Sequence, residues 1–447
     1  MKRILTFWSF ILCVVALCAA QPRVDTAPIS FSGAGDGKMV KIEYTLTGEP
    51  AVVTIDLQTN TLAGAVGEWV SIGGEGMGEL GGEANKVVYT LGSPAAAYWQ
   101  VSKTFGGEAF SADNLRAVVT AWPTNSPPDW MVVDLKRRNI VRWYATTNHF
   151  PGGFNDRAYK TTKLVMRKIP AKGVVWLMGS PMQLTDPANA TTNDVAHRVM
   201  FTYDYYAGIY ELTQAQYTNL GEVNYSKYAT EANADVLPVE RVAYSNFRGG
   251  IGTYKIHTRG HEVLANSLLG RFREFCGIAD MDLPTEAEWE YACRAGSSTE
   301  LPYDLPFTDA NVQSFGWVKD NAKNKPHEVG TSRPNAWGIY DMIGNVWELC
   351  LDAMGTTTAS NRDWLPSFHD SLVADWAEGG ITVDPIGASN GSGRIMKRGG
   401  SWYEYASTHN ATTNMRNDGD PAWASGASGT VGYIGGRLFC SVPAAVK

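Results

Sequence analysis

The sequence predicts an α+β protein of two domains, in which a β-sandwich over residues 27–168 precedes a loop-rich domain over residues 172–447. The length of 447 residues exceeds what one core usually holds. Apolar residues alternate with period two between residues 40 and 57, as in strands with one buried face. After residue 172, helix-capping patterns appear among Gly-, Asn- and Pro-rich stretches. The change of pattern near residue 170 therefore marks the predicted domain boundary.

The first twenty residues have the pattern of an export signal. Met1-Lys2-Arg3 is basic, residues 4–17 are apolar, and Cys18-Ala19-Ala20 supplies the small residues of a cleavage site. We expect cleavage after Ala20 and a secreted, periplasmic or cell-surface protein with no membrane contact afterwards. Lipid attachment at Cys18 is disfavoured by Leu17, and an uncleaved anchor is the remaining alternative.

Residues 27–168 are predicted to form short strands. The alternating runs at 40–46 and 53–57 flank a Gly48-Glu49-Pro50 turn, which predicts a β-hairpin. Further strands are expected in the segments AVVTAW, DWMVVDL and TKLVMRKI. Strands at this spacing favour an antiparallel sandwich of the immunoglobulin or fibronectin type. The Gly-rich segment at residues 73–82 has no helix signal after it and is interpreted as a turn rather than a phosphate loop.

Three helices are predicted in the second domain. Thr213 with Gln216, and Thr285 with Glu288, have capping-box spacing. A third helix is expected with Leu264, Leu268, Arg271 and Phe275 on one face and Gly277 at its end. Beyond residue 300 the chain is mostly loop, and such loops need clamps such as a metal, a disulfide or buried tryptophans.

Composition restricts the class of function. The formal net charge is −7 and no basic run occurs, so nucleic acid is not an expected partner. The cysteines outside the predicted signal are Cys276, Cys293, Cys350 and Cys440. Their spacing does not match a zinc site, and four cysteines allow three disulfide pairings.

Six motifs then occur in order between residues 176 and 439: WLMGSP, YELTQAQY, LPTEAEWEYACRAG, PNAWGIYDMIGNVWELC, KRGGSW and GGRLF. Together they resemble the formylglycine-generating enzyme (sulfatase-modifying factor) family. The resemblance covers roughly the last 270 residues. It implies a C-type-lectin-like fold and an enzyme that oxidises a sulfatase cysteine to formylglycine. The family's activity depends on two cysteines that bind copper.

The positions of those cysteines are occupied by other residues here. By the resemblance they fall at Glu404 and His409, and a third family cysteine falls at Asn414. A carboxylate and an imidazole do not reproduce the soft ligand field that Cu(I) prefers. They also cannot form a mixed disulfide with a substrate thiol. The tail reads Gly435-Gly436-Arg437, without the family's aromatic residue, and we therefore expect neither copper binding nor formylglycine formation.

The resemblance implies two structural clamps. A calcium site would take oxygens from Asp341, Gly344, Val346 and Glu348. The alternative is that Asp341 and Glu348 cap turns. A second calcium site would begin at Asn311 and Val312, with its other ligands unassigned. A disulfide between Cys276 and Cys440 is also implied, with uncertain register in the tail.

Three other constellations have simpler interpretations. His257 and His261 stand four residues apart, but they lack the glutamate of a metalloprotease motif and are expected in a solvated loop and helix start. The GASNG segment at 387–391 has no strand and helix around it and is interpreted as a turn. Glu404 and His409 have no third group fixed by spacing, so we treat them as loop residues before acid–base or hard-metal groups.

We interpret the chain as a secreted, non-catalytic protein that binds or displays a protein or glycan ligand. The expected binding residues are Trp347, Ser401, Trp402, Tyr403, Glu404, Tyr405, His409 and Arg416. The composition of residues 403–432 suits adaptable recognition. This stretch also looks like the variable proteins of diversity-generating retroelements, which carry GGSW before the varied segment. An ordinary solvated loop is the other interpretation.

Two further hypotheses remain open. One is a metal-dependent oxidoreductase of the family, acting on a sulfatase cysteine. Its iron-dependent sulfoxide-synthase branch carries a histidine-rich helical domain, whereas residues 27–168 contain only His149. The other is a scaffold or cell-surface component whose two domains only bind partners.

Overall fold

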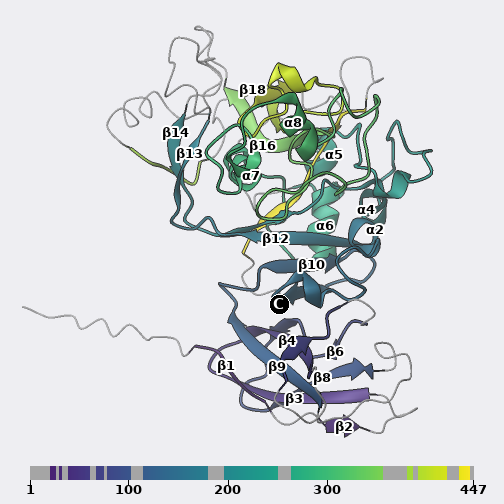
Figure 1. The fold of residues 1–447 in the computed structure, drawn as a ribbon, viewed down its shortest axis with the longest axis vertical. Helices are drawn as coiled ribbons and strands as arrows, with labels where there is room; N and C mark the ends of the chain where they lie inside the picture. The colour runs from purple at the N-terminus through teal and green to yellow at the C-terminus, as the bar shows by residue number, and fades with distance from the viewer. Residues whose placement is uncertain are drawn as a thin grey trace, which may run out of the picture.

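The computed structural model describes residues 21–26, 30–32, 39–60, 67–74, 78–101, 114–179, 196–249, 263–355, 380–385, 391–419 and 432–442. Several expectations lie outside these residues: the export signal, the pair His257 and His261, and most of the GASNG segment. The described chain is rich in β-sheet and has few helices, in agreement with the predicted α+β class. Figure 1 shows an N-terminal body in purple and dark blue and a second body whose colours run from blue through teal and green to yellow.

Two antiparallel sheets form the N-terminal body. The first contains β1 (Arg23–Thr26), β3 (Met39–Thr47), β8 (Pro94–Gln100) and β6 (Gly81–Gly82) in that order, with β2 (Ser30–Ser32) also paired to β3. The second contains β5 (Trp69–Ser71), β4 (Ala51–Asn60) and β7 (Lys86–Val88), with β9 (Leu115–Pro123) also paired to β4. Side chains from both sheets share one buried cluster, which includes Val40 and Ile42 of β3 and Val53 and Ile55 of β4.

The predicted hairpin at residues 40–57 is wrong in its pairing. The alternation itself is confirmed, because every second residue of β3 from Val40 to Leu46 is buried. However, β3 pairs with β1, β2 and β8, whereas β4 pairs with β5, β7 and β9. The turn at Gly48, which has a φ of +89°, carries the chain from one sheet to the other. Period two identifies the buried face of a strand but not the strand beside it.

The expected boundary at residues 168–172 also needs correction. The strands β10 (Trp130–Asp134), β11 (Val141–Tyr144) and β12 (Lys163–Ile169) were assigned to the N-terminal domain. In the structure they form one sheet with β15 (Tyr205–Gly208) and β21 (Phe439–Ser441), in the order β11-β10-β12-β15-β21. The division between the two bodies therefore lies between β9 and β10. The residue pattern of a strand does not determine which sheet the strand joins. The sequence therefore does not predict that β10, β11 and β12 belong to the second body.

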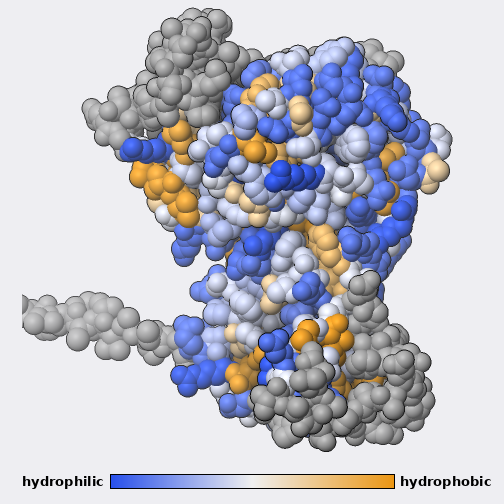
Figure 2. Space-filling view, viewed as in Figure 1, coloured by the Kyte–Doolittle hydropathy of each residue, from blue (hydrophilic) through white to orange (hydrophobic). Residues whose placement is uncertain are grey.

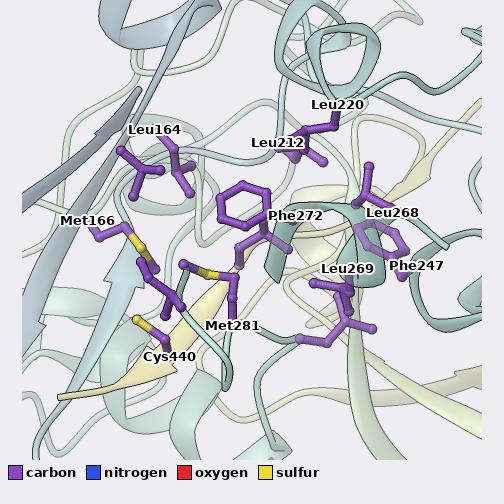
Figure 3. Close-up of a cluster of buried hydrophobic side chains, with 14 of the residues drawn as sticks. Leu164, Met166, Leu212, Leu220, Phe247, Leu268, Leu269, Phe272, Met281 and Cys440 are labelled. Carbon is purple, nitrogen blue, oxygen red and sulfur yellow. The ribbon is translucent and has the colours of Figure 1, made fainter. Parts of the chain in front are cut away.

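The described helices of the second body are α2 (Ala158–Thr161), α4 (Gln214–Asn219), α5 (Tyr244–Arg248), α6 (Leu268–Cys276), α7 (Glu286–Arg294) and α8 (Asp309–Phe315). Of these, α4, α5 and α6 contribute to one buried cluster with the sheet that contains β12, and α7 and α8 contribute to a second cluster. Figure 3 shows part of the first cluster, with Leu164 and Met166 of β12 on the side of Phe272 of α6 and with Leu268, Leu269 and Phe247 grouped farther along. Val52 of β4 belongs to the same cluster, so the N-terminal body packs against the second body.

Local signals for these helices were mostly correct. The capping boxes of Thr213 with Gln216 and of Thr285 with Glu288 are both formed. The helix expected to include Leu264 instead begins at Leu268, because the Ser267 side chain accepts a hydrogen bond from the Gly270 amide. Leu264 lies outside the helix and is 51% exposed. No helix in the described part of the chain is long and apolar enough to cross a membrane.

Two smaller sheets complete the second body. One contains β13 (Val175–Met178), β14 (His197–Met200) and β17 (Thr382–Val383). It exposes apolar side chains, including Val174, Val175, Ile381 and Val383, and an orange patch lies over β13 and β14 in Figure 2. The other sheet contains β19 (Arg416–Gly419), β18 (Gly391–Arg398), β16 (Trp347–Gly355) and β20 (Ile434–Gly435) in that order. This second sheet positions the GGSW motif.

Candidate functional site

The GGSW motif forms a tight turn directly after β18. Gly399 and Gly400 have φ values of +94° and +78°, a region that favours glycine. A Cβ on Gly400 would approach the Asn410 carbonyl oxygen to 2.7 Å, so the turn also lacks room for a side chain. Ser401 is completely buried and accepts a hydrogen bond from the Tyr403 amide. The motif therefore fixes where residues 402–405 leave the sheet.

A buried ion network lies beneath this turn. Arg398, the last residue of β18, pairs with Glu286 at 2.8 Å and with Glu290 at 3.0 Å, both on α7. Arg416 of β19 also pairs with Glu286. Burial raises the pKa of the Glu286 carboxyl, but Arg416 and Arg398 together hold that pKa below its ordinary value. Arg416 was expected to contact a ligand, and this is wrong in the structure because its side chain is buried in the network.

The exposed part of the site is a row of tyrosine rings, with Lys319 between two of them and Lys397 5.9 Å from the Tyr433 ring centroid. The ring of Tyr403 is stacked on that of Tyr433, with centroids 5.8 Å apart. The Lys319 ammonium lies 4.7 Å from the Tyr403 ring centroid and 4.5 Å from that of Tyr405. Tyr403 and Tyr405 are 45% and 47% exposed. We call these four residues, Tyr403, Tyr405, Tyr433 and Lys319, the tyrosine–lysine surface.

Two hydrogen bonds hold the loop of Lys319 against residues 404–406. The Lys319 amide donates to the Glu404 carbonyl oxygen at 2.8 Å. The Ala406 amide donates to the Asp320 carboxylate at 2.8 Å. These two contacts hold the backbone of Lys319 beside the segment that carries Tyr403 and Tyr405.

The expected binding residues Trp347 and Trp402 form the floor of the surface and are themselves buried. The Trp402 indole donates to the Gly432 carbonyl oxygen at 2.7 Å, and its ring meets Tyr403 edge-on at 5.7 Å. The Trp347 indole faces Glu404, with its nitrogen 3.4 Å from a carboxylate oxygen. These tryptophans support the surface from below rather than presenting their rings to solvent.

Glu404 and His409, expected from the resemblance at the family's cysteine positions, face different partners. Glu404 accepts a hydrogen bond from the Asn410 side chain at 3.1 Å. The exposed His409 ring stacks on Phe307 at 3.7 Å, and its Nδ1 lies 3.5 Å from the Glu300 carboxylate. The structure therefore does not bring Glu404 and His409 together as one acid–base or metal-binding pair. Asn414, at the third cysteine position, is buried and its carbonyl oxygen accepts from Arg398.

The four described cysteines are buried thiols. Burial raises the pKa of Cys276 to about 12 and raises the pKa of Cys293 and Cys350 as well. A thiol with a raised pKa supplies little of the reactive thiolate at neutral pH. Cys276 and Cys440 lie in the same buried cluster, but the structure contains them as thiols and not as the expected disulfide.

The residues expected to bind calcium lie around a buried arginine. Glu348 pairs with Arg437 at 2.7 Å and accepts a hydrogen bond from the Trp289 indole at 2.7 Å. Asp341 accepts hydrogen bonds from the Gly330 amide and the Ser332 hydroxyl. Among the described residues, no group of three or more His, Cys, Asp or Glu side chains is arranged to hold a metal. This geometry does not fit a resident calcium ion while Arg437 is paired with Glu348.

The contacts described for Gly344 and Val346 involve atoms other than the backbone carbonyl oxygens that a calcium ion would take. The Val346 amide donates to Glu211 at 3.0 Å, and Gly344 packs so closely on the Trp317 backbone that a Cβ would approach its oxygen to 2.4 Å. Asn311 and Val312, expected to begin a second site, lie in α8. Calcium binding stays a prediction of the resemblance.

Three features of the site were not found from sequence. Lys319 and Tyr433 are far from the GGSW motif along the chain, and no local pattern marks either one. Glu211, in the YELTQAQY motif, is buried beside the calcium-type residues. Burial, followed by the charges of Asp341 and Glu348, raises its pKa well above the ordinary value. The sequence signal for Glu211 is a single carboxylate between Ile209, Tyr210 and Leu212, just after β15.

Comparisons with known proteins agree with the motifs. A family model described as the sulfatase-modifying factor enzyme 1-like domain matches residues 161–429. The formylglycine-generating enzyme of Bos taurus is 26% identical over 297 residues, covering 56% of this chain and 68% of that protein. The inactive C-alpha-formylglycine-generating enzyme 2 of Bos taurus is 34% identical over 84 residues, covering 17% of this chain and 28% of that protein.

Among solved structures, Treponema denticola variable protein 1 is similar with a TM-score of 0.43 and 22% identity, over 62% of this chain and 95% of that chain. The family model, in contrast, matches more than half of the present sequence. This chain therefore belongs to the sulfatase-modifying factor enzyme 1-like family through its C-terminal domain.

Proposed function

We propose that the chain is a secreted, non-catalytic binding protein whose ligand contacts the tyrosine–lysine surface. The resemblance implies that Glu404 and His409 stand where the family's active enzymes have cysteines. One observation supports the proposal: the two side chains face different partners. Neither side chain can form a mixed disulfide with a substrate thiol. The four described cysteines are buried and do not replace them.

Charge at the site also argues against the family's usual substrate. A sulfatase motif, Cys-x-Pro-x-Arg, carries an arginine. Of the described carboxylates none pairs with Lys319. The carboxylate of Asp320, the next residue, accepts a hydrogen bond from the Ala406 amide, and that of Glu404 accepts one from the Asn410 side chain. An ammonium in this position repels an incoming guanidinium. The same residues suit a binding role, because exposed tyrosines provide large contact areas at low entropic cost.

The proposal includes a fold for each of the two bodies. We propose that the two N-terminal sheets form an immunoglobulin- or fibronectin-like sandwich and that the second body has a C-type-lectin-like arrangement. The shared cluster between the two N-terminal sheets supports the first part. The basic, apolar and small residues at 1–20 support export. The ligand is a protein or a glycan.

The catalytic alternative is tested by mass spectrometry. A Cys-x-Pro-x-Arg peptide is incubated with the purified chain and Cu(I), and an active formylglycine-generating enzyme serves as the positive control. We expect the peptide thiol to remain unchanged. Conversion of that thiol to an aldehyde would establish the oxidoreductase alternative and overturn the proposal.

The binding role is tested with paired variants. Glycan arrays and peptide display identify ligands of the wild-type chain, and Tyr403→Ala combined with Tyr405→Ala should abolish the signal. Tyr225→Ala is the control, because Tyr225 is 70% exposed and lies outside the surface. Equal loss of signal in the control and the double variant would contradict the assignment of the surface.

A further inference from the structure

The tyrosine–lysine surface presents a positive charge held between two phenol rings. The Lys319 ammonium lies within 5 Å of both ring centroids, at 4.7 Å and 4.5 Å. The ammonium has three donors, and cation–π contact with the rings uses none of them as a conventional hydrogen bond. Among the described residues, no carboxylate forms an ion pair with it, and Glu404 is turned toward Trp347 and Asn410. A ligand with an anionic group is therefore complementary to this point of the surface.

The backbone around Lys319 offers few donors to a ligand. The amides of Lys319 and Glu404 donate to carbonyl oxygens inside the protein. The amide of Tyr403 donates to the Ser401 hydroxyl, and that of Ala406 donates to Asp320. Peptides that bind by strand addition need a row of unpaired backbone groups. Recognition here must instead use the side chains, namely two ring faces and the charge between them.

This combination fits a sugar ring with a carboxylate. The C–H face of a sugar packs on a phenol ring, the tyrosine hydroxyls and the ammonium can donate to the sugar's oxygens, and the carboxylate pairs with the ammonium. A pre-formed ring also loses less conformational freedom on binding than an extended peptide does. We propose that the tyrosine–lysine surface binds a carboxylate-bearing glycan, with Lys319 as the residue that selects the acidic sugar. This inference rests on the proposed binding function and adds the ligand's chemical class.

Calorimetry of the purified full chain with three probes tests the inference: an oligogalacturonate, a neutral galactan oligosaccharide of the same length, and a polyglutamate peptide. We expect the oligogalacturonate to bind best and its affinity to fall with added salt. Lys319→Gln should weaken this binding about tenfold or more, the loss expected for one charge-assisted hydrogen bond. Lys319→Arg should restore most of it.

Lys325→Gln is the matched control, because Lys325 lies on the same loop and is already paired with Glu231 at 2.8 Å. It should leave the affinity unchanged. Equal affinity for galactan and galacturonate, tighter binding of polyglutamate, absence of galacturonate binding, or equal loss in both lysine variants would each overturn the inference. The proposed function would survive these results if Tyr403→Ala with Tyr405→Ala still abolished binding of a ligand found by array or display.

Discussion

Charged side chains on the two sides of the GGSW turn differ in burial and in pairing. Beneath it, Arg398 and Arg416 are buried and paired with glutamates of α7. Above it, Lys319 lies between half-exposed tyrosines with no described carboxylate paired to it. A buried charge needs a partner because its desolvation costs several kcal/mol, whereas a partly solvated ammonium does not. The interior network therefore serves stability, and the unpaired surface charge is available to a ligand.

The largest expected effect comes from breaking the interior network. Arg398→Met leaves Glu286 and Glu290 with one fewer cation each, and we expect it to lower the free energy of unfolding by roughly 3–5 kcal/mol. Urea denaturation measures the change. Lys325→Met removes an exposed ion pair with Glu231 and should cost at most about 1 kcal/mol. Similar losses in the two variants would show that the buried network is no more important than a surface pair.

The next effect concerns pH and a buried acid at the edge of the binding surface. Glu240 is completely buried, and a Cβ on Gly432 would approach its carboxylate to 1.9 Å. Burial raises the pKa of Glu240 from 4.5 to about 7, although Tyr228, Arg241 and Lys227 act to lower it. The folded chain thus keeps this proton over a range in which the unfolded chain has released it.

The contribution of Glu240 to stability should therefore be fully present below about pH 4.5 and fall as pH rises toward 7, since the folded state binds more protons in that window. The fall attributable to Glu240 is on the order of 3 kcal/mol, because its pKa rises from 4.5 to about 7 on folding. Glu240→Gln should remove this part of the pH dependence, and chemical denaturation between pH 4.5 and 7.5 measures it. Parallel curves for the variant and the wild type would contradict a raised pKa in the folded state.

Sequence reasoning was most successful where the controlling interactions are local. The capping boxes at Thr213 and Thr285 form because a side chain and a backbone amide three residues apart meet in any helix start. The alternation in β3 also gave the correct buried face. Strand partners were not predictable, because β3 and β4 separate into different sheets and β12 pairs with β15 across the expected boundary.

The candidate site shows the same limit. Tyr403 and Tyr405 follow the recognised motif and were expected at the surface, where they lie. Arg416 has a similar polar neighbourhood in sequence but is drawn inside by Glu286, which lies on a distant helix. Lys319 joins the two tyrosines only through tertiary contacts. Burial and long-range charge pairing determine which of these side chains reach the surface, and a local sequence pattern predicts neither.

Thiol chemistry gives a smaller effect. Because Cys276 and Cys440 are buried as thiols, a reducing agent should not change the melting temperature, and native alkylation should label none of the four described cysteines. After unfolding, peptide mapping should find all four labelled. A disulfide between Cys276 and Cys440 would instead protect both from labelling after unfolding without reductant. Its reduction would then lower the melting temperature.

The smallest expected effect is that of calcium, and it separates two accounts of the residues around Glu348. In the structure Arg437 supplies the positive charge that a calcium ion would supply in the arrangement implied by the family resemblance. Binding of a cation to the folded state alone would raise stability by about 2.7 kcal/mol at a hundredfold excess over its Kd. Because the charge of Glu348 is already paired with that of Arg437, we expect the same melting temperature in calcium and in EDTA.

A higher melting temperature in calcium that Asp341→Ala removes would support the metal site and require Arg437 to leave Glu348. Arg437→Met distinguishes the accounts further: it should destabilise the chain in EDTA, and calcium should rescue it only if Glu348 and its neighbours can serve as ligands.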